Sequence, residues 1–259
     1  MCPNPCDEWR ERPLYWSTIG YLRTWWATDG AWVSLIEREG GMTPELLSAI
    51  AKEYFVHRNI VGGVQERASN ITNICRMLNC KSRNWPSSSL IERAELCDQL
   101  TTKMHEKEYT RSREFSGLSK FMWFIKPYDW TMYDKFATYG LNIAGSENAD
   151  KFKCFYKKLH HADFSHLVEN MQREIENTEF KGLPATRIVD TLLMARGGRG
   201  GDTFSVSSFE AFLQVLPSHT SCNLVSLAQT LQRRFGDHPL ASPNRPDRQR
   251  RGRGRQRRR

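Results

Sequence analysis

A lysine and an aspartate flank an apolar stretch near the middle of the sequence. The stretch GLSKFMWFIKPYDWTMYDKFATYG runs from Gly117 to Gly140, with Lys120 directly before five apolar residues, 121–125, and Asp134 fourteen positions after it. A lysine packed against apolar side chains is partly desolvated, which disfavours its ammonium form and favours the nucleophilic neutral amine. An ionised acid beside such a lysine would complete an amine-nucleophile site.

Two helices are expected to position this pair. Five consecutive apolar residues cover every side of a helix, so the first helix should be buried on most faces. It should end at Lys126, because Pro127 disfavours helical geometry in the residue before it. Asp134 is expected at the N-cap of the second helix, where backbone N–H groups and the helix dipole keep its carboxylate ionised. A purely structural alternative stays open, in which Asp134 is only a cap and Lys120 a solvated helix end.

The same stretch resembles the helix-hairpin-helix DNA glycosylases, in particular a divergent bacterial branch with the 8-oxoguanine DNA glycosylase fold. In that family a glycine-containing hairpin joins two helices, a lysine stands at the start of the second helix and an aspartate caps the next one. Here FSGLSK corresponds to the end of the hairpin, Lys120 to the lysine and Asp134 to the aspartate. The resemblance implies that Lys120 and Asp134 are catalytic and that Gly117 and Ser119 bind DNA. Only one of the two usual hairpin glycines is present, and no four-cysteine iron–sulfur loop follows.

A second, shorter likeness lies at EYFVHRNIVGGVQERA. Relatives with the oxoguanine glycosylase fold have an asparagine-rich turn before a helix, and this turn fills the gap that a flipped base leaves in the duplex. His57, Arg58 and Asn59 occupy a comparable place in the sequence. The likeness implies that these three residues bind DNA, and the alternative is an ordinary polar helix end.

The resemblance also implies a mechanism. A glycosylase flips its target base out of the stack before the bond between base and sugar breaks. Asp134 would stabilise the positive charge that develops on the sugar. Lys120 would either attack the sugar carbon and form a Schiff base, which permits strand cleavage, or bind phosphate while water attacks. Trp123 and Tyr133 are candidates for the base pocket.

The expected function is excision of a damaged or modified base, either an oxidised purine or a bulky modified base of viral DNA, in DNA repair or antiviral defence. The expected partner is double-stranded DNA that contains such a base, and we expect no cofactor. No metal site is expected either, because His161 and His166 are five residues apart, a spacing unsuited to one helix face. A noncatalytic helical DNA-binding protein of a defence or toxin system is the alternative.

Helical signals dominate the rest of the chain. Thr43 and Ser89 are expected N-caps, and Pro44 follows at a first helical position. Several segments have apolar residues at the 3-4 spacing of one helix face. Asp190 lies within an apolar helix, so we expect it to pair with Arg187 or with a residue of another helix.

These signals predict an all-α, helix-hairpin-helix glycosylase-like bundle of about ten helices. The helical domain should cover residues 13–236. Two helical subdomains that flank a cleft are one arrangement that fits these signals. An irregular segment, 1–12, precedes the domain. A disordered arginine-rich tail, 237–259, follows it.

The positive charge is concentrated at the C-terminus. Residues 244–259 contain nine arginines and one aspartate, a net charge of +8, so the rest of a chain of charge +9 is nearly neutral. Such a segment attracts polyanions through phosphate contacts and counterion release. Nucleic acid is favoured as its target over an anionic membrane surface or an acidic protein.

Cysteines and apolar runs indicate the compartment. The seven cysteines contain no CxxC pair, and the sequence has neither a signal-peptide pattern nor an apolar run of membrane-spanning length. We expect a monomeric, cytoplasmic, nucleoid-associated protein with reduced cysteines.

Overall fold

The computed structural model describes residues 12–86, 89–143, 148–198 and 206–241, and this part of the chain is all-helical. The α-helices are α1 (Pro13–Thr24), α2 (Gly30–Arg38), α3 (Pro44–Glu53), α4 (Val64–Ser82), α5 (Leu90–Glu106), α6 (Phe115–Ile125), α7 (Lys135–Gly140), α8 (Asn148–His161), α9 (Phe164–Glu176), α10 (Ala185–Arg196), α11 (Val206–Val215) and α12 (Ser218–Phe235). A π-helical turn, η2 (Trp25–Asp29), joins α1 to α2, and a 3-10 turn, η3 (His57–Asn59), follows α3. The predicted all-α class is confirmed.

Local sequence signals set several helix boundaries. The side chains of Thr43 and Ser89 accept N-cap hydrogen bonds at the starts of α3 and α5, and Pro44 begins α3. Helix α6 ends at Ile125, one residue before the expected end at Lys126, which is its C-cap. The residue before a proline avoids helical geometry, which explains why the helix stops here. These boundaries follow from local backbone chemistry, which explains why the sequence predicts them.

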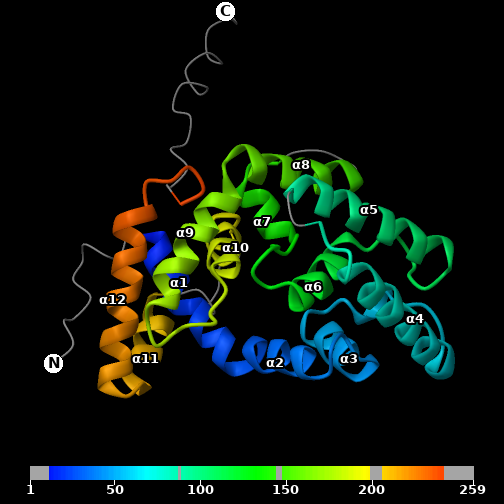
Figure 1. Cartoon of the computed structure of the whole chain (residues 1–259), viewed down its shortest axis with the longest axis horizontal. Helices are drawn as coiled ribbons and strands as arrows, with labels where there is room; N and C mark the ends of the chain where they lie inside the picture. Colours follow the sequence, from blue (N-terminus) through cyan, green and yellow to red (C-terminus); the bar gives the residue numbers. More distant parts are fainter. Residues whose placement is uncertain (1–11, 87–88, 144–147, 199–205, 242–259) are drawn as a thin grey trace, which may run out of the picture.

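The helices form two groups that meet near α10 (Figure 1). One group contains α1, α9, α10, α11 and α12, so helices from the two ends of the described chain pack together. The other group contains α3, α4, α5, α6 and α8. Helix α10 packs against α1 in its own group and against α7, which follows α6 in the chain. Because α10 is packed between α1, α7 and α9, its residues are almost all buried.

The packed core reaches beyond the expected end of the helical domain. Leu240 and Ala241 are buried although they follow residue 236. Residues 242–259, most of the predicted tail, lie outside the described residues, as do residues 1–11.

Two findings bear on the compartment. In the described part of the chain, no helix combines the length and apolar character needed to cross a membrane. Cys75, Cys80, Cys97 and Cys154 are free thiols.

Two glycines allow α7 and α10 to approach closely. A Cβ atom at Gly197 would lie 1.7 Å from the carbonyl oxygen of Phe136, and one at Gly140 would lie 2.1 Å from the carbonyl oxygen of Leu193. No side chain fits at these distances, so any larger residue must push the two backbones apart. Because Asp134 caps α7, this contact fixes the position of Asp134 relative to α10.

We therefore predict that Gly197→Ala destabilises the protein by about 1–3 kcal/mol, the usual cost of overpacking a dense contact. Gly63→Ala is the matched control, because a Cβ atom there meets no other atom within 4 Å. Thermal unfolding should show a clear loss for Gly197→Ala and a smaller change for Gly63→Ala. Equal melting temperatures for the two variants would contradict the packing argument.

Candidate active site

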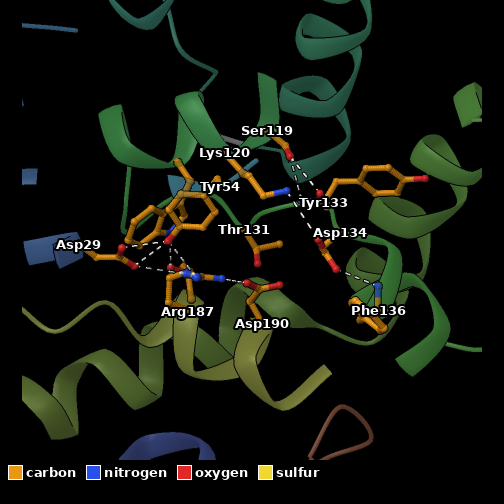
Figure 2. A network of polar contacts seen from close by, with 12 residues as sticks. Asp29, Tyr54, Ser119, Lys120, Thr131, Tyr133, Asp134, Phe136, Arg187 and Asp190 are labelled. Atoms are coloured by element: carbon orange, nitrogen blue, oxygen red, sulfur yellow. Dashed lines mark hydrogen bonds and ion pairs between the residues drawn. The ribbon is translucent and has the colours of Figure 1, made fainter. Parts of the chain in front are cut away.

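Lys120 and Asp134 face each other across the gap between α6 and the start of α7. The Lys120 Nζ atom lies 3.6 Å from Asp134 Oδ2 and 2.5 Å from Ser116 Oγ. Only 8% of the Lys120 side chain is exposed, against 21% for Asp134. Figure 2 shows both side chains pointing toward one another. A nearly buried amine and a partly exposed carboxylate thus lie close enough to contact one sugar ring.

Asp134 is an N-cap, as the sequence predicts. Its Oδ1 atom accepts a hydrogen bond of 2.8 Å from the Phe136 N–H group, which leaves Oδ2 directed at Lys120. The residue has extended backbone geometry, as N-caps require. One carboxylate oxygen therefore holds the helix start while the other remains available to a ligand.

The chain between α6 and α7 is tied back onto α6 by Ser119. The Ser119 hydroxyl accepts a hydrogen bond from the Tyr133 N–H group, and the Trp130 indole N–H donates to the Ser119 carbonyl oxygen. Both contacts are buried. They hold the residue before Asp134 against the residue before Lys120, which explains how positions fourteen residues apart come together.

The expected DNA contacts at FSGLSK need correction. Helix α6 begins at Phe115, so Gly117 and Ser119 lie inside the helix and are buried. A Cβ atom at Gly117 would lie 3.5 Å from the Val56 side chain, an ordinary van der Waals distance, so Gly117 lies against the chain after α3. Lys120 accordingly lies in the second turn of α6 rather than at its start. Ser119 has a structural role in the buried hydrogen bonds described above.

The structure brings the second predicted DNA-binding segment next to α6. His57, Arg58 and Asn59 form the turn η3, in which Arg58 is exposed. A small, mainly apolar hollow is lined by residues that include Asn59 and Gly117. The turn and the N-terminal end of α6 are therefore neighbours, although more than fifty residues separate them in the sequence.

Phe55 is a feature of this turn that sequence reasoning missed. Its side chain is 73% exposed, and its backbone is left-handed, with φ of 57°. The Phe55 and Val56 N–H groups bond back to the carbonyl oxygens of Lys52 and Ala51, so Phe55 occupies the position after a helix end where glycine is usual. A bulky residue in this conformation is strained. An exposed aromatic ring at a strained position is a sign of function.

The two aromatic residues expected in the base pocket lie in the core instead. Trp123 is fully buried, and its indole N–H donates to Thr186 Oγ1. Tyr133 packs against Phe152 and Phe155 of α8 and is also buried. The spacing of aromatic residues in the sequence does not show which of them pack in the core and which line a pocket.

A second polar cluster lies deeper, beside the Lys120–Asp134 pair (Figure 2). The Arg187 guanidinium pairs with Asp190 on the next turn of α10, as expected, and with Asp29 of η2 at 3.9 Å. The Tyr54 hydroxyl donates to Asp29 Oδ1 at 2.9 Å and lies 3.3 Å from Arg187. Rings of Tyr21 and Trp123 cover the guanidinium. This cluster connects η2, the end of α3 and α10.

Burial shifts the ionisation of this cluster. It raises the pKa of Asp29, and the Arg187 guanidinium and the Tyr54 hydroxyl offset this only in part. Burial also raises the pKa of Tyr54, so the phenol stays neutral. Burial alone would lower the pKa of Arg187, but Tyr54 and Asp29 more than compensate and raise it. Arg187 is therefore a permanent buried cation whose partners lie on three different elements.

Comparison with known proteins adds no assignment. Neither the models of known protein families, nor curated protein sequences, nor solved structures give a significant match to this chain. Among the described residues there is also no group of three or more His, Cys, Asp or Glu side chains arranged to hold a metal ion. The relation to helix-hairpin-helix glycosylases thus stays a prediction that rests on the motif around Lys120 and Asp134.

The raised pKa of Asp29 predicts a specific pH dependence. A carboxyl group with a folded pKa above its unfolded value of 3.8 binds protons more tightly in the folded protein. Stability should therefore fall as pH rises from about 4 through the folded pKa. Asp29→Asn removes this titration, so its melting temperature, measured across the acidic range, should decline less with rising pH than that of the unmodified protein. Parallel curves for the two proteins would contradict the assignment.

Proposed function

We propose that this protein is a DNA glycosylase that flips a damaged or modified base out of a duplex and excises it. The observation that carries the proposal is the placement of Lys120 Nζ 3.6 Å from Asp134 Oδ2, with both groups at the margin of a buried polar region. Side chains that pointed apart would have been incompatible with one shared sugar. A capped carboxylate beside a sheltered amine supplies the charge stabilisation and the nucleophile that such a reaction needs.

Asp134 is suited to stabilise the transition state. The bond between the sugar C1′ atom and the base breaks with its electrons moving to the base, and positive charge develops on the sugar. The Asp134 Oδ2 atom faces the gap toward Lys120, whereas Oδ1 is held by the Phe136 N–H group. Because the cap fixes the carboxylate before the reaction, little reorganisation is needed when the charge appears.

Lys120 determines which product forms. If its neutral amine attacks C1′, the N–C1′ bond forms as the base leaves, and loss of a proton and opening of the sugar ring give a Schiff base. Elimination from that intermediate cleaves the strand. If Lys120 stays protonated and only orients the sugar–phosphate backbone, a water molecule attacks and an intact abasic site remains. The partner in either case is duplex DNA that contains the target base.

The turn around η3 supplies contacts to the duplex in this proposal. Phe55 projects from the surface, and the exposed Arg58 follows three residues later. Apolar wedges that enter a base step and cationic side chains that bind phosphate are typical of proteins that distort DNA. Phe55 would fill the space that the flipped base leaves, and Arg58 would bind the backbone beside it.

A noncatalytic DNA-binding protein is the second candidate. It is favoured by the nine arginines between residues 244 and 259, which can bind DNA without any chemistry. In that case the Lys120–Asp134 contact is a structural ion pair between α6 and α7. The two candidates differ in whether a base is released.

The test uses duplexes that each carry one damaged or modified base, together with modified viral genomic DNA, incubated with and without borohydride. We expect base release that Asp134→Asn slows at least about 100-fold, as loss of an electrostatic catalytic group does. A borohydride-trapped adduct that disappears in Lys120→Gln assigns the amine as nucleophile, whereas abasic sites without an adduct assign water. DNA binding with no base release from any substrate would overturn the proposal in favour of the second candidate.

Phe55→Gly separates stability from function. Glycine adopts positive φ without strain, and the phenylalanine ring is mostly exposed, so the variant should be as stable as the unmodified protein or more stable. We expect slower base release at the same time, because the ring no longer fills the duplex. Melting temperature and release rate, measured on one preparation, check this. A release rate equal to that of the unmodified protein would exclude Phe55 from the DNA interface.

A further inference from the structure

Two buried polar atoms near the Lys120–Asp134 pair have no hydrogen-bond partner among the described residues. They are Asp190 Oδ1 and Thr131 Oγ1. Both residues are 0% exposed. Leaving a buried polar group unsatisfied costs roughly 1–3 kcal/mol, and more for a charged group. Other buried polar atoms of the described residues, Arg187 Nε among them, also lack a hydrogen-bond partner, so the location of these two atoms decides what they indicate.

Their location relates them to the candidate active site. Thr131 precedes Asp134 by three residues, on the segment that Ser119 holds against α6. Figure 2 shows Thr131 between the Lys120–Asp134 pair and α10, with its hydroxyl pointing toward Asp190. The side chain of Asp134 is 21% exposed, whereas the residues Thr131 and Asp190 are 0% exposed. If the sugar of a flipped nucleotide lay against Asp134, the far edge of its base would point toward these two atoms.

The fold itself does not account for either atom. The other carboxylate oxygen of Asp190, Oδ2, already pairs with Arg187, so Oδ1 is not needed to balance that charge. The Thr131 residue takes part in the fold through its carbonyl oxygen, which accepts a hydrogen bond from the Tyr156 hydroxyl. A valine at position 131 would keep this contact and remove the unsatisfied hydroxyl. Polar atoms that destabilise the free protein are best explained by a ligand that satisfies them.

We propose that Asp190 Oδ1 and Thr131 Oγ1 recognise the flipped base, and that the preferred base carries an exocyclic amino group. This inference rests on the proposed glycosylase function. A carboxylate oxygen only accepts hydrogen bonds, so it selects an N–H group on the base and disfavours a carbonyl oxygen at the same position. The Thr131 hydroxyl can donate to a ring nitrogen or accept from a ring N–H group beside it. Both residues are 0% exposed. In this proposal a base reaches them only when the segment that carries Thr131 moves outward, against the hydrogen bonds with Ser119 and Tyr156 that hold it.

Asp190→Asn provides the sharpest test, because it changes the acceptor into a donor at nearly constant shape. The amide oxygen can keep the contact with Arg187, which directs the NH₂ group toward the base. Release rates are compared on duplexes with 5-hydroxymethylcytosine against 5-hydroxymethyluracil, and with 8-oxoguanine against 8-oxohypoxanthine. We expect the unmodified protein to favour the amino member of the pair it acts on by at least about 100-fold, because a site built to hydrogen-bond a substrate N–H group strongly rejects an analogue that lacks it. Asp190→Asn should abolish or reverse that preference.

Thr131→Val keeps the inference testable if Asp190→Asn does not fold. Valine has nearly the same shape and leaves no hydrogen bond broken in the free protein, so the melting temperature should be unchanged or higher. Release of the base that carries the amino group should nevertheless slow by about tenfold. This factor corresponds to the free energy of one hydrogen bond of ordinary strength. Equal release of both members of a pair, or an unaltered rate in Thr131→Val, would overturn this inference while leaving the glycosylase proposal intact. No release of any base from any duplex would overturn the proposed function and this inference with it.

Discussion

The burial of the Arg187 guanidinium is the constraint on which the arrangement of the site depends. Removing a permanent cation from water is costly unless acceptors surround it, and here those acceptors come from α10 itself, from η2 and from the end of α3. The three elements are therefore fixed relative to one another. Helix α7 packs against α10 through Gly140 and Gly197, so the position of Asp134 follows from that of α10.

The two groups of helices each contribute one half of the candidate active site. Lys120 comes from α6, in the group that contains α3 to α5, whereas Asp190 comes from α10, in the group that contains α1 and α12. Asp134 and Thr131 lie on the chain that runs between them. A site built at such a junction draws its polar groups from both groups, so a nucleotide bound as proposed above would contact both of them.

One strained residue and two unsatisfied polar atoms belong to the candidate site and the turn beside it, although both kinds of feature also occur elsewhere in the described residues. Phe55 has a left-handed backbone that favours glycine, and Thr131 and Asp190 each keep a buried oxygen without a partner among the described residues. Each feature lowers the stability of the free protein. All three are explained together if DNA covers the Phe55 side of the molecule and a base reaches Asp190.

Sequence reasoning succeeded where the determining interactions are local. The N-cap at Asp134, the end of α6 before Pro127 and the pairing of Asp190 with Arg187 one turn away all follow from backbone geometry or from spacing on one helix. It failed where distant segments decide. Gly117 was expected in a hairpin, but it lies inside α6 beside Val56. The sequence also gives no sign that Asp29 and Tyr54 face Arg187. Trp123 illustrates the same limit, because only the packed structure reveals that Arg187 covers its ring.

The most direct measurement is a crystal structure of the Asp134→Asn variant bound to a duplex that contains a stable abasic-site analogue. We expect the sugar of the analogue to lie between residue 134 and Lys120 Nζ, with Phe55 inserted in the base stack opposite. DNA bound elsewhere, with Lys120 and residue 134 still in contact and closed to the sugar, would show that the pair is only a structural ion pair.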